Sequence, residues 1–176
     1  MENIKNILVP TDFSPNATKA LDYAVQLARR TRSSILLLHI VESNEIAETT
    51  EENSEKMELI KKSIQQTVHV DINTRQIKGL AIDSILYTIN SEAIDLVIMG
   101  TVGNSRFSEK IFGSKTAKII GTSPIPVLAI PLLSEWGNHP DILLAINDFK
   151  AEEKKNNSGY TTGKAFAFQI ASCYIY

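Results

Sequence analysis

The chain has 176 residues, of which 43% are hydrophobic and 22% charged, and its formal net charge at pH 7 is −2. This length and balance suit one globular domain with a sizeable core and are too short for two full domains. The charge predicts no nucleic acid and no membrane surface as partner. A single cysteine, Cys173, excludes an internal disulfide framework. With no signal-peptide pattern and no apolar run long enough to cross a bilayer, we expect a cytoplasmic protein.

Short apolar runs alternate with segments of helical periodicity. Strands are predicted at residues 7–9, 35–41, 68–77, 96–99 and 127–130. Most of these runs are nearly continuous in Ile, Leu and Val, as in strands that are buried on both faces of a parallel sheet. The order βαβαβαβαβ therefore predicts an α/β fold with a five-stranded, parallel, doubly wound, Rossmann-like sheet. In such sheets, ligands bind beyond the carboxyl ends of the strands.

Four helices are expected between these strands. The first opens with Ser14 as N-cap and Pro15 in its first turn, and its apolar stripe holds Ala17, Ala20, Leu21, Ala24, Leu27 and Ala28. The second is predicted at 51–66, after an acidic segment, 45–55, that we expect to be a loop or a first turn. The third is predicted at 82–93, and the fourth follows Gly113 with Ala117 and Ile120 facing inward.

A short internal sequence repeat follows the fifth strand. Residues 143–149 repeat the pattern of residues 7–13, because each segment is an apolar run that ends in Asp-Phe. We therefore divide the chain into an α/β domain at 1–132, a linker at 133–140 and a last segment at 141–176. That last segment is either the start of an incomplete second repeat or a loose tail.

A glycine-rich segment between the fourth strand and the fourth helix is the most informative motif. Glycines at 100, 103 and 113 let the backbone approach a ligand closely. Gly113 and Ser114 stand at a helix start, where free N–H groups and the helix dipole attract phosphate. The hydroxyls of Ser114 and Thr116 add donors, and Lys115 can neutralise charge. The spacing matches neither a P-loop nor a dinucleotide fingerprint, and a surface loop with glycines in turns is the alternative.

Asp12 follows the first strand directly. A carboxylate at that position can accept hydrogen bonds from an adenine amino group or a ribose hydroxyl. The alternative is a structural role, in which Asp12 turns the chain or helps to cap the first helix.

Together these residues resemble the universal stress protein family. The pattern Gly100-x-x-Gly103, nine residues, Gly113-Ser114 is similar to the nucleotide-binding signature of that family. The opening at 7–14 and the last turn and strand at 123–128 are similar to the corresponding family segments, and the resemblance spans residues 4–132. Val102, at a position often polar or basic in the family, and the lack of proline in Gly79-Leu80-Ala81-Ile82 are departures that leave the glycine frame intact.

The resemblance implies a fold of the adenine-nucleotide alpha hydrolase-like type and a site for ATP, accompanied by Mg or Mn. It places around adenine and ribose the residues Pro10, Thr11, Asp12 and Val41. It places Met99 under the sugar, and around ribose and phosphates Gly100, Thr101, Gly103, Gly113, Ser114, Lys115 and Thr116. No protein ligand for the metal and no catalytic residue is evident. The implied function is an ATP-binding regulatory module of the stress response.

Several alternatives remain beside that function. The chain can be a partner-binding or dimerisation module without nucleotide, or a slow ATPase that relies on positioning alone. A receiver domain is excluded, because it needs an Asp after the third strand and a Lys after the fifth. The three histidines, His39, His69 and His139, lack the neighbours of a catalytic site, and we interpret His39 as a satisfied core or crevice group. The resemblance also implies a homodimer through the edge strand Val127–Ile130, since an apolar edge is a pairing template.

Overall fold

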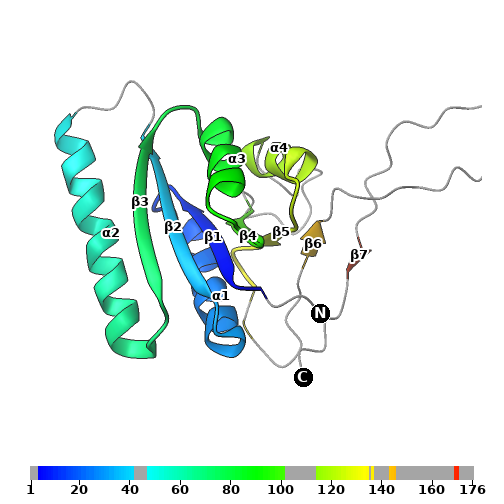
Figure 1. The fold of residues 1–176 in the computed structure, drawn as a ribbon, viewed down its shortest axis with the longest axis horizontal. Helices are drawn as coiled ribbons and strands as arrows, with labels where there is room; N and C mark the ends of the chain where they lie inside the picture. The colour runs from blue at the N-terminus through cyan, green and yellow to red at the C-terminus, as the bar shows by residue number, and fades with distance from the viewer. Residues whose placement is uncertain are drawn as a thin grey trace, which may run out of the picture.

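The computed structural model describes residues 4–41, 47–101, 114–134, 136, 143–145 and 169–170. Its strands form one sheet (Figure 1): β1 (Asn6–Thr11), β2 (Ser34–Val41), β3 (Ile72–Lys78), β4 (Leu96–Gly100), β5 (Val127–Ile130), β6 (Leu143–Ala145) and β7 (Gln169–Ile170). The strand order is β3-β2-β1-β4-β5-β6-β7. The first five strands are parallel, which confirms the predicted sheet.

Helices cover both faces of the parallel strands: α1 (Pro15–Thr31), α2 (Ala47–Val68), α3 (Ala81–Ser91) and α4 (Ser114–Thr122). Side chains alternate between the two faces of a strand, and β1 is buried on both. Ile7 and Val9 pack in a cluster with α1 and α2, whereas Leu8 packs in a second cluster with α3 and α4. The continuous apolar runs therefore reflect two cores, one on each face of the sheet. None of the described helices is both long and apolar enough to cross a membrane.

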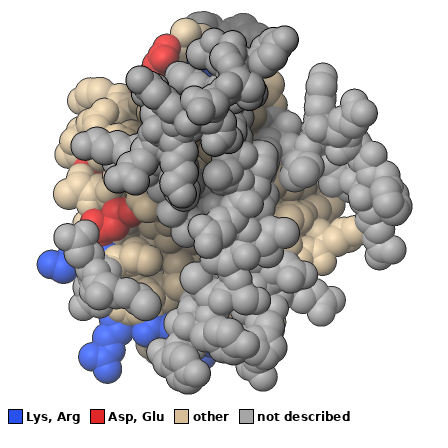
Figure 2. Space-filling view, turned by 90° about the vertical axis from the view of Figure 1, so that its right-hand side faces the viewer, with Lys and Arg blue, Asp and Glu red and all other residues tan. Residues whose placement is uncertain are grey.

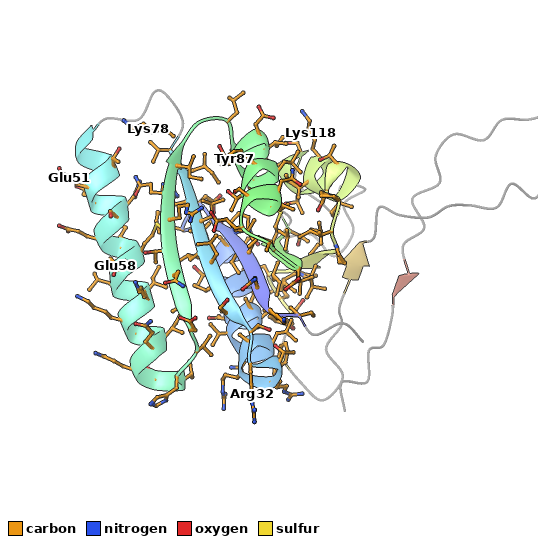
Figure 3. The ribbon with its side chains drawn as sticks, in the orientation of Figure 1. Arg32, Glu51, Glu58, Lys78, Tyr87 and Lys118 are labelled. Carbon is orange, nitrogen blue, oxygen red and sulfur yellow. The ribbon has the colours of Figure 1, made fainter. Side chains whose placement is uncertain are left out.

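Helix α1 begins and ends where local chemistry dictates. Ser14 is its N-cap and accepts a hydrogen bond from the N–H of Ala17 (3.3 Å), with proline at the start of the helix. Arg29 and Arg30 occupy its last turn, where cations complement the helix dipole. Figure 2 shows Lys and Arg atoms at the lower left of its face, and Figure 3 labels Arg32 at the lower end of α1. Lys78, at the end of β3, lies at the opposite end, where the parallel strands have their carboxyl ends.

Three sequence predictions need correction. Helix α2 already begins at Ala47, so most of the acidic segment is helical, which suits acidic side chains near a helix N-terminus. It continues to Val68, His69 follows in a left-handed conformation (φ 55°), and β3 starts only at Ile72. In α4 the inward face holds Thr116, Ile119 and Ile120, so Ala117 is exposed.

The edge of the sheet beyond β5 differs from the open edge that the sequence analysis predicts. β6 pairs antiparallel with β5, with Leu128 opposite Leu144. β7 in turn pairs antiparallel with β6. The repeat of the first strand thus contributes a strand of this same sheet, while residues 146–149 lie outside the described residues.

Candidate functional site

A cavity of about 420 Å³ opens at the carboxyl ends of β1 and β4. These two strands are neighbours, and the chain leaves β1 toward β2 and β3 before it crosses to β4 and β5. The cavity therefore lies at the point where strand order reverses, which is the usual ligand position in open α/β sheets. It is lined by Pro10, Thr11, Asp12, Ser14, Asn16, Ala17, Ile40, Ala81, Ile85, Met99, Gly100, Ser114, Lys115 and Thr116.

The cavity gathers most of the residues that the sequence analysis selects. Those lining it are Pro10, Thr11, Asp12, Met99, Gly100, Ser114, Lys115 and Thr116. Val41 does not line it: the side chain is buried, and the carbonyl accepts a hydrogen bond from the N–H of Gly79 (3.0 Å). Thr101 is also buried, and its N–H donates to the carbonyl of Ile130 (2.9 Å). Gly103 and Gly113 lie outside the described residues.

The loop after β1 is held by hydrogen bonds within itself. The N–H of Phe13 donates to Oγ1 of Thr11 (3.0 Å), and the N–H of Ser14 donates to Oδ1 of Asp12 (3.0 Å). Asp12 thus has the chain-turning role that the sequence left open. A carboxylate offers about four acceptor sites on two oxygens, so this bond leaves capacity for a ligand.

Asp12 is an ionised acceptor at neutral pH. Partial burial raises the pKa of its carboxyl, but hydrogen bonds from Ser14 and from its own backbone N–H, together with the nearby Lys115 ammonium, lower it further than burial raises it. The pKa therefore lies below its ordinary value of 3.8. A ligand group that meets Asp12 must be a hydrogen-bond donor or a cation.

Gly100 allows α1 and β4 to approach each other closely. A Cβ on Gly100 would lie 2.4 Å from the carbonyl oxygen of Asn16 and 2.9 Å from Cβ of Asn16. No side chain tolerates such contacts with backbone. Glycine at this position is required by the packing of α1, whether or not a ligand is present.

The first turn of α4 forms the opposite wall. Ser114, Lys115 and Thr116 line the cavity there. The first N–H groups of a helix have no acceptor within the helix, and the positive end of its dipole lies at the same place. Thr116 is buried, and its hydroxyl donates to the carbonyl of Gly100 (3.1 Å). Its proton is thus already used to join α4 to β4.

The comparison with known proteins agrees with this architecture. The model of the universal stress protein family matches residues 3–131. The chain belongs to the universal stress protein family. Universal stress protein Sll1654 of Synechocystis is 31% identical over 134 residues, which cover 72% of this chain and 85% of that protein. Universal stress protein MJ0577 of Methanocaldococcus jannaschii is 28% identical over 153 residues, covering 72% and 94%.

Solved structures of this family share the fold. The structure of MJ0577 aligns with a TM-score of 0.64 and 31% identity, covering 73% of this chain and 96% of that one. A universal stress protein in complex with cAMP aligns with a TM-score of 0.57 and 20% identity, covering 74% and 99%. The shared part is the parallel sheet with its helices.

Six residues that line the cavity of this universal stress protein are absent from the sequence prediction: Ser14, Asn16, Ala17, Ile40, Ala81 and Ile85. The first three belong to the cap and first turn of α1, directly after Asp12. The predicted start of this helix could therefore have indicated that they lie near Asp12 and the cavity. Ile40 takes the place expected of Val41 because successive strand residues face opposite sides. The part played by α3 depends on how that helix packs on the sheet, which no local motif indicates.

We expect Gly100→Ala to destabilise the protein by about 1–3 kcal/mol, because the new methyl group collides with the backbone at Asn16. Gly121→Ala is the matched control, since an added Cβ there meets nothing within 4 Å and Gly121 lies inside α4. The control should be stabilised by about 0.5–1 kcal/mol. Urea unfolding measures both changes, and equal effects of the two substitutions would contradict the assignment.

The lowered pKa of Asp12 predicts a pH-dependent contribution to stability. Stability from a group whose pKa is depressed in the folded state is present above its ordinary pKa and is lost as the pH falls through the folded value. Asp12→Asn should therefore destabilise the protein at pH 5–8, and the difference should shrink below the ordinary pKa of 3.8. Urea unfolding of both proteins from pH 7 to pH 3 tests this, and a difference that stays constant over that range would refute it.

Proposed function

We propose that this universal stress protein binds ATP in the cavity between β1 and β4 and acts as a regulatory module of the stress response. The observation that carries the proposal is the convergence of the β1 loop, the glycine at the end of β4 and the start of α4 on one cavity. Its volume of about 420 Å³ lies within the roughly 300–1,000 Å³ range of small-molecule sites.

The chemistry of the cavity walls suits the two ends of a nucleotide. On one side, ionised Asp12 accepts hydrogen bonds, as adenine amino and ribose hydroxyl groups require. Asn16 also lines the cavity, and its Oδ1 is buried without a hydrogen-bond partner among the residues that the structure describes. On the other side, the start of α4 with Lys115 favours anionic phosphates. The relative in complex with cAMP supports a nucleotide as the ligand class.

The described lining residues suit a divalent ion as a companion of the phosphates. Asp12 is the sole carboxylate among the described residues that line the cavity. Within the described part of the chain, no three His, Cys, Asp or Glu side chains are grouped so that they could hold a metal. Mg²⁺ commonly keeps several waters and binds through substrate phosphates. Mg or Mn would thus be bound mainly by ATP, and Lys115 would share in neutralising the charge.

Calorimetric titration of the full chain with ATP and magnesium tests the proposal. We expect Asp12→Ala to weaken binding at least about tenfold, because hydrogen bonds to charged groups contribute roughly 1.5–3 kcal/mol. Asp83→Ala is the control, since it removes the same charge from an exposed position on α3 outside the cavity lining. No heat from the folded wild-type protein with ATP, ADP or cAMP would favour a partner-binding module that uses no nucleotide.

We further propose a cytoplasmic homodimer formed through the edge of β5, on the basis of the sequence. The four side chains of β5 are all buried, and β6 already pairs with its backbone. A second copy could join β5 only if β6 left that edge. The proposed dimer is therefore in competition with the chain's own residues 143–145.

This competition predicts a response to a proline in β6. Leu144→Pro removes a backbone N–H from the strand and disfavours its pairing, so the dimer fraction should rise. Leu144→Val keeps the N–H and should behave as the wild type. Light scattering over a range of protein concentrations provides the measurement. A Leu144→Pro protein that is folded and remains monomeric would argue against dimerisation through β5.

A further inference from the structure

His39, in β2, connects this strand with β1 and with α2. It is 6% exposed. Its Nδ1 is 2.9 Å from the carbonyl oxygen of Thr11, in β1, and its Nε2 is 3.2 Å from Nδ2 of Asn53, in α2. Asn53 is equally buried, at 6%. A polar chain thus runs from the end of β1 through β2 to α2.

The partners of the ring determine where its hydrogen lies. A carbonyl oxygen only accepts hydrogen bonds, so Nδ1 must carry the hydrogen that reaches Thr11. In the neutral ring, Nε2 then has a lone pair and accepts from the amide nitrogen of Asn53. Because both ring nitrogens are used within the chain, His39 has no nitrogen left for a ligand.

The loop that His39 holds is the one that carries Asp12. Thr11, whose carbonyl meets His39, also accepts the N–H of Phe13 on its hydroxyl. Phe13 has a left-handed backbone (φ 59°), a conformation that a phenylalanine rarely adopts without support. Its ring lies 4.7 Å from the His39 ring, and Nζ of Lys56 in α2 lies 5.9 Å from its centre. Contacts from β2 and α2 therefore stabilise this backbone conformation of Phe13.

We propose that His39 and Asn53 are positioning residues of the nucleotide site. They fix the Thr11 carbonyl and the Phe13 turn, and in this way set the direction of the Asp12 carboxylate, although neither residue lines the cavity. The inference rests on the proposed function for its ligand. Its effect on the loop is a property of the nucleotide-free protein and can be measured independently.

The first experiment therefore uses the full chain without nucleotide. Nitrogen NMR of the imidazole should report the tautomer with hydrogen on Nδ1, and a neutral ring with hydrogen on Nε2 would overturn the inference. Hydrogen exchange at the amides of Phe13 and Ser14 should accelerate at least about tenfold in His39→Leu, since loss of a brace makes local opening easier. Unchanged exchange in a folded variant would also overturn it.

The second experiment measures ATP affinity in variants that are folded at the assay temperature. His39→Leu should weaken ATP binding about tenfold, and Asn53→Leu about threefold, because Asp12 is then less well oriented toward the ligand. A tenfold loss corresponds to about 1.4 kcal/mol of binding free energy. His39→Asn should restore most of the affinity, because its amide nitrogen replaces Nδ1 as donor to Thr11.

Ser33→Ala is the matched control. Ser33 is buried, and its hydroxyl donates to the carbonyl of Ile4 (2.7 Å). Like His39, it thus joins two segments through a hydrogen bond from a side chain to a backbone carbonyl, but at the amino end of the sheet. This control should lose stability and keep its ATP affinity within about twofold, since it is remote from the site. If the loss of ATP affinity is proportional to the loss of stability in all variants, the control included, the inference is overturned.

Absence of ATP binding by the wild type would instead refute the proposed function. The tautomer and exchange measurements would still decide the role of His39.

Discussion

The approach of α1 to β4 at Gly100 is the contact on which the site depends. The carbonyl of Asn16 occupies the space that any other residue at position 100 would need for its Cβ. This contact places the first turn of α1 directly over the end of β4, beside the loop that carries Asp12. The hydroxyl of Thr116 then joins α4 to the same Gly100 carbonyl. One residue without a side chain thus holds three of the cavity walls at a fixed separation.

Intrachain bonds already fix the polar groups around the cavity. Asp12 accepts from Ser14, Thr116 donates to Gly100, and the Thr11 carbonyl accepts from His39. Such bonds reduce the conformational freedom that a ligand would otherwise have to remove, which favours binding. They also show that structural and ligand-binding interpretations of Asp12 are compatible. The same hydrogen bonds that turn the chain keep its carboxylate ionised and oriented.

Periodicity and caps were sufficient to predict the parallel sheet, α1 and the strand ends that meet at the cavity. Predictions failed where tertiary packing overrides a local pattern. The left-handed His69 separates α2 from β3 in a segment whose alternation suggested one strand. Ile40 rather than Val41 lines the cavity, and α3 contributes Ala81 and Ile85 through its position on the sheet. Asn53 had no signal, because a polar residue in an acidic helix normally faces water; only its contact with His39 reveals a role.

The segment beyond the family match covers one edge of the sheet with an additional strand. The family model ends at residue 131, and β6 at 143–145 adds an antiparallel strand to an otherwise parallel sheet. An open strand edge presents unpaired N–H and C=O groups that another chain can use. β6 pairs with β5 at Val127, Leu128 and Ala129, and β7 pairs with β6 in turn. The proposed nucleotide cavity lies at the carboxyl ends of β1 and β4. In the proposed dimer, this added edge would therefore act on association between copies while the cavity keeps the geometry that Gly100 sets.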